Sequence, residues 1–263
     1  MRNHNFVLIA LLAIYLVVLP TTATSDIHIV RYAPDGTTIL NEKTVNYIWM
    51  ETNLPVLGDG TTHYYHQGPT FNESDLWDPA EYQNVESRDY GAVKGTAVRD
   101  LCGLVGGMGS GDTLKVKAED GFYKNFSHAT VYAENPRKGT MGLAWYVGED
   151  SVTGDPQGSG YVPEYYDGMR LIFFADASTN PWGRHVFGDT DMKETLPEGE
   201  WHFFSGTWPS TSGLSVKQVS DLEIYTGHET NGGENTPETP TPQAPLGIAA
   251  VLAALVAGIL LRR

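Results

Sequence analysis

Two apolar segments at the ends of the chain limit what it can become. Residues 1–24 begin with Arg2, continue through the apolar run 6–19 and end in small residues, which is typical of a cleaved secretory signal peptide. An uncleaved N-terminal anchor is the alternative. Residues 246–263 are uncharged and apolar up to a terminal pair of arginines, which predicts a transmembrane helix or a sorting tail.

The part between these segments divides into a folded region and a spacer. Residues 229–245 are rich in Thr, Pro and Glu, a composition that favours an extended linker. Residues 25–228 are then expected to form one extracytoplasmic domain, held at the cell surface on the outer face of the cytoplasmic membrane. In this arrangement the membrane is contacted through the C-terminal segment. Cleavage and lipidation of that segment at residues 244–247 stay open.

Charge and cysteine content narrow the possible functions. The formal net charge of −15 comes from 32 acidic against 17 basic residues and excludes nucleic acid as a partner. Because Cys102 is the only cysteine, neither an intrachain disulfide nor a cysteine-based zinc cluster can form. Stability must come from a hydrophobic core. Asn72 and Asn125 stand in Asn-x-Ser sequons, which are weak glycosylation signals.

The hydrophobic pattern predicts an α+β domain with a mixed or antiparallel sheet and short helices. Residues 26–40 alternate in polarity around a Pro-Asp-Gly turn, as in a β-hairpin. Residues 42–55 place Val45, Ile48 and Trp49 at helical spacing before a proline and predict a short helix.

The middle of the chain repeats this alternation of helix and hairpin. Residues 94–109 predict a helix capped by Thr96 and ended by two glycines. Its expected buried stripe is Val98, Leu101, Cys102 and Val105. A hairpin is expected over residues 112–126, and later strands at 141–147, 169–175 and 222–226.

The runs "GTAVRDLCGLVGG", "DTLKVKAEDGFYKNF", "MRLIFFA" and "LSVKQVSDLEIYT" resemble, in their order, the molybdopterin-binding fold of sulfite oxidase over residues 91–226. That resemblance implies a metal bound by a loop cysteine. Cys102 instead lies on the apolar face of a predicted helix, where a cysteine acts as a small hydrophobe. We therefore expect the fold without its molybdenum cofactor.

The runs "VNYIWMETNLPVLGDGTTHYYHQGP", "FADASTNPWGRHVFGD" and "WPSTSGLSVK" resemble a family of methanogen cell-surface proteins, some of which carry the label argininosuccinate synthase. Such a synthase needs a glycine-rich pyrophosphate loop between a strand and a helix. Here "GGMGSGDT" at residues 106–113 follows a helix and precedes a strand, so the sequence does not support that activity.

Four histidines are candidate ligands for a transition metal. His63 and His66 lie in the long segment 55–89, and their spacing would put both imidazoles on one side of a turn or helix. His185 and His202 are the candidates to complete the site. The alternative is that these histidines line a pocket or hydrogen-bond the backbone, with no metal bound.

Aromatic residues in Gly- and Pro-rich segments are the second candidate site. The residues expected to contact a ligand are Tyr65, Trp77, Trp182 and Trp208. Such rings stack on sugars, peptides or flat cofactors, and they also close hydrophobic cores. Asp189 to Glu194 lacks the glycine and distal glutamate of a calcium loop and is expected to be a solvated acidic turn.

These features favour a membrane-anchored cell-surface or envelope protein that binds a small ligand or an envelope component. No catalytic residue is expected, because the sequence contains neither a nucleophile elbow nor a recognisable Ser-His-Asp order. The alternative is an exported redox protein, metal-dependent or molybdopterin-related, that uses His63 and His66 with His185 or His202.

Overall fold

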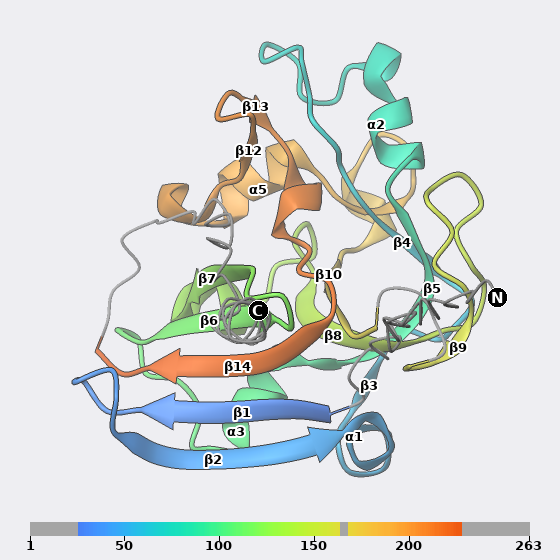
Figure 1. Cartoon of the computed structure of the whole chain (residues 1–263). Coiled ribbons are helices and arrows are strands. Elements are labelled where there is room, and N and C mark those ends of the chain that lie inside the picture. Colours follow the sequence, from blue (N-terminus) through green and yellow to red (C-terminus); the bar gives the residue numbers. More distant parts are fainter. Residues whose placement is uncertain (1–25, 164–167, 228–263) are drawn as a thin grey trace, which may run out of the picture.

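The computed structural model describes residues 26–163 and 168–227, which form a mixed α+β structure of several sheets and short helices (Figure 1). The predicted α+β class is confirmed, although the strands divide into more than one sheet. The predicted signal peptide, linker and C-terminal apolar segment lie outside the described residues. Within those residues, no helix has the length and apolar character needed to cross a membrane.

The first sheet contains both predicted hairpins. Strand β14 lies at its centre, parallel to β1 and antiparallel to β6. The final strand of the domain therefore joins its two N-terminal strands to the hairpin at residues 113–127. In spatial order the strands are β2 (Ile39–Asn46), β1 (Asp26–Tyr32), β14 (Val219–Tyr225), β6 (Thr113–Ala118) and β7 (Tyr123–Ser127).

The second sheet positions the candidate site. Its strands in order are β10 (Arg170–Phe174), β8 (Thr140–Val147), β5 (Asp89–Ala97), β4 (His63–His66) and β11 (His185–Phe187). Two short strands, β3 (Val56–Leu57) and β9 (Gly160–Tyr161), pair with β5 and β8. A separate ribbon joins β12 (Phe203–Phe204) and β13 (Trp208–Pro209).

The helices are short and lie at the ends of strands. They are α1 (Tyr47–Asn53), α2 (Gln83–Glu86), α3 (Val98–Gly103), α4 (His128–Tyr132) and α5 (Asp189–Thr195). Single 3₁₀ turns occur at η1 (Pro79–Glu81), η2 (Ala177–Thr179), η3 (Glu198–Glu200) and η4 (Thr211–Leu214). In Figure 1, α2, α5 and the β12–β13 ribbon lie at the opposite end of the molecule from β1 and β2.

One hydrophobic core joins the two sheets. Ile29 and Leu222 of the first sheet share it with Leu143 and Trp145 of the second, and all four side chains are buried. The predicted stripe of α3 also faces this core, since Val98, Leu101, Cys102 and Val105 are fully or almost fully buried. The interior of the domain thus contains the apolar positions that the alternating and helical patterns predict.

The helix predicted over residues 42–55 begins later than expected. Strand β2 continues to Asn46, whose side chain accepts a hydrogen bond from the Trp49 amide and caps α1. Ile48 is 59% exposed, and Met50 fills the core instead. Thr96, predicted as a helix cap, is the penultimate residue of β5, where its hydroxyl accepts the Trp145 indole N–H.

Candidate functional site

Strand β4 determines where the two central histidines point. The sequence interpretation placed His63 and His66 on one side of a turn or helix, but both belong to an extended strand. Neighbouring side chains of a strand alternate between its faces, so residues three apart point in opposite directions. His63 faces a surface groove, whereas His66 is completely buried. The expected His-x-x-His pair is therefore not formed.

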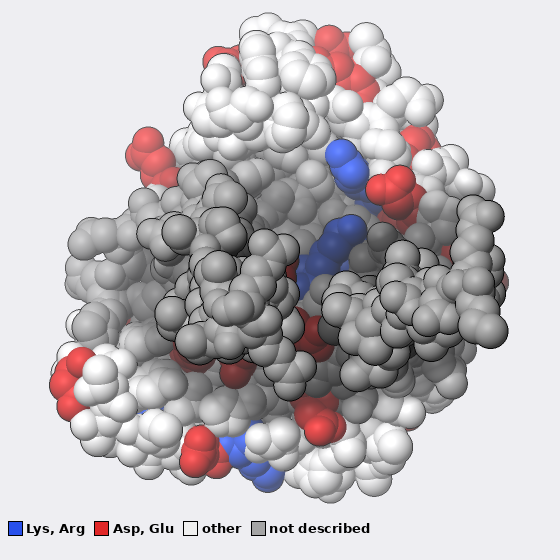
Figure 2. Space-filling view, viewed as in Figure 1, with Lys and Arg blue, Asp and Glu red and all other residues white. Residues whose placement is uncertain are grey.

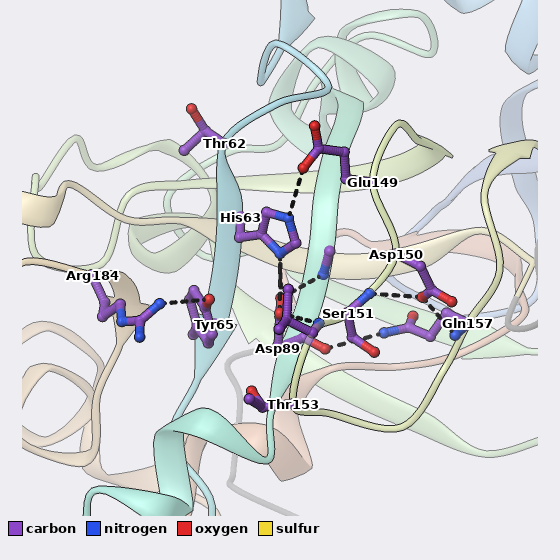
Figure 3. Close-up of polar contacts among 12 residues, drawn as sticks. Thr62, His63, Tyr65, Asp89, Glu149, Asp150, Ser151, Thr153, Gln157 and Arg184 are labelled. Atoms are coloured by element: carbon purple, nitrogen blue, oxygen red, sulfur yellow. Dashed lines mark hydrogen bonds and ion pairs between the residues drawn. The ribbon is translucent and has the colours of Figure 1, made fainter.

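His63 is held by a buried carboxylate. Its Nδ1 lies 3.0 Å from both carboxylate oxygens of Asp89, which starts the neighbouring strand β5 and has no exposed side-chain surface. Asp89 also accepts the backbone N–H groups of Gly91 and Val152. With Nδ1–H donated to Asp89, the second ring nitrogen, Nε2, is left toward solvent, 3.7 Å from the exposed carboxylate of Glu149 (Figure 3).

The groove beside His63 has a second polar wall. The Arg184 guanidinium donates to the Tyr65 hydroxyl at 2.9 Å and pairs with Glu86. Burial raises the pKa of Tyr65 to about 12, so its hydroxyl stays protonated. The Thr153 hydroxyl bonds Glu86 from the facing loop. We call the surface formed by His63, Tyr65, Glu86, Thr153 and Arg184 the histidine groove; it has a volume of about 410 Å³.

His66 lies among core residues. Its Nδ1 donates to the Thr211 carbonyl at 3.0 Å, and its Nε2 accepts the Phe173 amide at 3.3 Å. The ring also packs edge-on against Tyr90 and Phe187. Burial lowers the pKa of this imidazole to about 3, and the nearby Arg170 charge adds to that effect. Both nitrogens of the neutral ring are used, so His66 cannot bind a metal.

The other two predicted metal ligands lie elsewhere. His185, on β11, donates Nδ1–H to the Ala175 carbonyl at 2.8 Å and packs against Tyr64, although its residue borders the rim of the histidine groove. His202 lies in a different pocket, with its Nδ1 3.3 Å from the Lys124 ammonium. In the part of the chain that the structure describes, no three His, Cys, Asp or Glu side chains converge on a metal position.

The predicted aromatic site divides as well. Tyr65, Trp77 and Trp182 come together in a small cluster with Val85 and Val186, where the two indoles meet edge to face at 5.0 Å. Trp208 is separate and contacts Phe71 at 5.3 Å. These rings therefore pack against one another, and within this set Tyr65 alone borders the histidine groove.

The residues do not fit a molybdenum centre held by cysteine. Cys102 has no exposed surface and packs in the central core. Its burial raises the thiol pKa to about 12, whereas a metal ligand must be a thiolate. The side chain is thus a small core hydrophobe, as its place on the apolar face of the helix predicts.

The histidine groove contains a positioned hydrogen-bond acceptor. A buried aspartate that accepts Nδ1–H fixes the tautomer and the orientation of an imidazole. Nucleophilic catalysis would also need a hydroxyl or thiol within hydrogen-bond reach of Nε2. In the described residues the contact of His63 Nε2 is with Glu149, and no such hydroxyl or thiol bonds it.

Sequence reasoning missed Asp89, Glu86 and the role of Arg184. Asp89 is 26 residues from His63 along the chain, and only the pairing of β4 with β5 brings them together. Arg184 directly precedes the predicted His185, the first residue of β11, so the correct segment was found with the wrong side chain.

Comparisons of the chain with protein-family models, with curated proteins and with solved structures find no match.

Proposed function

We propose that this protein is a non-catalytic binding protein of the cell surface, and that the histidine groove binds a hydroxyl-rich ligand such as an envelope glycan. The observation that carries the proposal is the His63–Asp89 pair: an imidazole 16% exposed, fixed by a carboxylate with no exposed surface. Fixing the ring before a ligand arrives lowers the entropy that binding would otherwise cost.

The mixture of groups in the groove supports the ligand class. His63 Nε2, the carboxylate of Glu149 and the Thr153 hydroxyl oxygen are acceptors, while the Arg184 guanidinium can donate. Each hydroxyl of a sugar both donates and accepts, so a saccharide can satisfy both kinds of group at once. The Tyr65 ring adds apolar surface against which a sugar can lie.

The cellular location is part of the same proposal. The apolar termini and the Pro/Thr-rich linker support export and attachment at the outer face of the cytoplasmic membrane. The resemblance to methanogen surface proteins supports the same place. Protease added to intact cells should remove the domain, and its full protection in such cells would contradict this location.

Titration calorimetry of the purified full chain against a panel of mono- and disaccharides tests the ligand class. We expect saturable binding of at least one saccharide, weakened at least tenfold by His63→Gln, a change that keeps a polar side chain but loses the ring. The matched control is His28→Gln, because His28 also pairs with carboxylates, Glu42 and Asp221, but lies on β1 of the other sheet.

Two outcomes would overturn the proposal. Saccharide affinity that is equal in the wild type and His63→Gln would remove the groove as the site. Stoichiometric zinc or copper in the purified protein, lost in His63→Gln, would favour a metal-dependent function, for which the described residues supply no complete ligand set.

A further inference from the structure

A second, larger cavity shares no lining residue with the histidine groove. It has a volume of about 510 Å³ and lies between the start of β5, strand β10 and the segment that follows β13. We call it the arginine pocket and define it by Arg88, Arg170, Ser210, Ser215 and Lys217. Three cationic side chains in one cavity are unexpected in a chain with a net charge of −15.

Arg88 is the unusual member. Its Nε atom is buried and has no hydrogen-bond partner among the residues that the structure describes. The contrast is with arginines that pair with carboxylates: Arg31 with Asp112, Arg99 with Glu134, Arg137 with Asp191 and Arg184 with Glu86. A buried donor without an acceptor costs free energy. Because Arg88 also lines the cavity, its remaining N–H groups can donate to an acceptor from outside the protein.

Arg170 is held rigidly beside it. Its Nε donates to the Ser215 hydroxyl and its Nη1 to the Gln157 side chain, each at 2.8 Å. The guanidinium carbon lies 3.7 Å from the centre of the Tyr90 ring, and the residue is only 6% exposed. A guanidinium fixed on three sides loses little further freedom when it binds a ligand.

The remaining lining is polar and suits an anion. The hydroxyls of Ser210 and Ser212 lie 2.9 Å apart, and Lys217 is exposed at the edge. Figure 2 shows basic side chains in the hollow at the centre of this face, with acidic side chains around it. Of the acidic residues that line the cavity, Asp155 is exposed and Asp89 directs its carboxylate to His63.

We propose that the arginine pocket binds the carboxylate or phosphate group of a small organic anion, with Arg88 as its principal partner. A guanidinium offers planar pairs of N–H donors that match both oxyanions, and hydrogen bonds between charged groups are stronger than neutral ones. The cavity is larger than a single phosphate needs, so it can also hold the rest of the organic molecule to which the charged group is attached.

Equilibrium binding to the purified full chain tests the proposal. Inorganic phosphate, sulfate and acetate are titrated separately at constant ionic strength, with sodium chloride as the reference salt. We expect at least one oxyanion to bind saturably, and Arg88→Gln to weaken that binding at least tenfold. The matched control is Arg99→Gln, which removes a charge that pairs with the exposed Glu134 outside the pocket. Phosphate bound in preference to acetate would indicate a phosphoester ligand, and the reverse would indicate a carboxylate.

Two results would overturn the proposal: no oxyanion binds above the chloride reference, or Arg88→Gln binds as tightly as the wild type. Loss of folding is not expected to confuse the test, because the buried Arg88 Nε has no hydrogen bond to lose among the described residues. The unfolding midpoint is measured in the same samples. If Arg88→Gln lowers it, Arg88→Lys replaces it, since lysine keeps the charge and loses the planar donor pair. Its oxyanion affinity should fall at least threefold, and an unchanged affinity would refute the role of Arg88.

Discussion

His63 and His66 belong to the same four-residue strand, but their side chains lie in opposite environments. His66 is fully buried, and each of its nitrogens has a backbone partner, the Thr211 carbonyl or the Phe173 amide. His63 bonds a buried carboxylate through one nitrogen and turns the other toward solvent. The difference shows two roles for a histidine. It stabilises the fold when both ring nitrogens have hydrogen-bond partners in the core. It can bind a ligand when one nitrogen is held by a protein group and the other faces solvent.

The surroundings of the two residues differ in the same way. Beside His66, a buried polar network joins Gln67, Thr70, Asp189 and Thr211; for example, Asp189 accepts the Thr70 hydroxyl at 2.5 Å and the Thr211 amide at 2.8 Å. This network ties the ends of β4 and β11 to the segment after β13. The groove beside His63 instead has polar groups at its surface that have room for further partners.

The largest expected effect is on stability, at His66. Replacement by alanine removes two buried hydrogen bonds and leaves a cavity between Tyr90 and Phe187. We expect His66→Ala to lower the free energy of unfolding by about 4 kcal/mol, the range of large-to-small changes in a core. Urea unfolding measures it. A loss no greater than that of His63→Ala would remove the distinction between the two faces of β4.

The second prediction concerns the pH dependence of stability. Because burial lowers the folded-state pKa of His66 to about 3, from 6.5 in the unfolded chain, acid favours unfolding. The stabilising contribution of the neutral ring is complete above pH 6.5 and declines as the pH falls toward 3. Between pH 6.5 and 5 the loss is about 2 kcal/mol.

Comparison with His66→Gln isolates this contribution, since other groups titrate alike in both proteins. Urea unfolding at pH 7, 6 and 5 should show a steeper decline for the wild type than for the variant. Parallel declines would mean that His66 takes up its proton in the folded protein near its ordinary pKa.

The same comparison shows where sequence reasoning succeeded. The hairpin of β6 and β7 was predicted because its apolar residues follow the alternating period. Of the helix predicted over residues 94–109, only Val98–Gly103 forms α3, and the residues up to Ala97 belong to strand β5. Strand β4 has only four residues and lies among glycines and prolines, so its alternation gave no usable signal. Without that strand, the opposite directions of His63 and His66 could not be predicted.

The prediction for the acidic segment 189–194 was wrong for a related reason. It was expected to be a solvated turn, yet Asp189 and Asp191 are fully buried in the first turn of α5. Burial raises the pKa of Asp189 well above its usual range, while hydrogen bonds from Thr70 and Thr211 oppose that shift. Those partners come from distant parts of the chain, and no local pattern records them.

The third prediction is a smaller stability effect at His63. His63→Gln removes the Nδ1 bond to Asp89, but Gly91 and Val152 still donate to that carboxylate. We expect a loss of about 1 kcal/mol in the free energy of unfolding, the usual contribution of one hydrogen bond. Thermal unfolding with matched urea data measures it, and a loss as large as that of His66→Ala would make His63 a structural residue too.

The smallest effect is expected at the rim of the histidine groove, where Val152 is 81% exposed. Its backbone N–H holds Asp89, whereas its side chain lies in solvent, so Val152→Ser keeps the contact that fixes His63. Stability should change by less than about 0.5 kcal/mol, as for exposed positions generally. Saccharide affinity should also stay within about threefold, because the polar groups of the groove are untouched. A tenfold change in affinity without a change in stability would place apolar contact at the rim, and not the His63–Asp89 pair, at the centre of recognition.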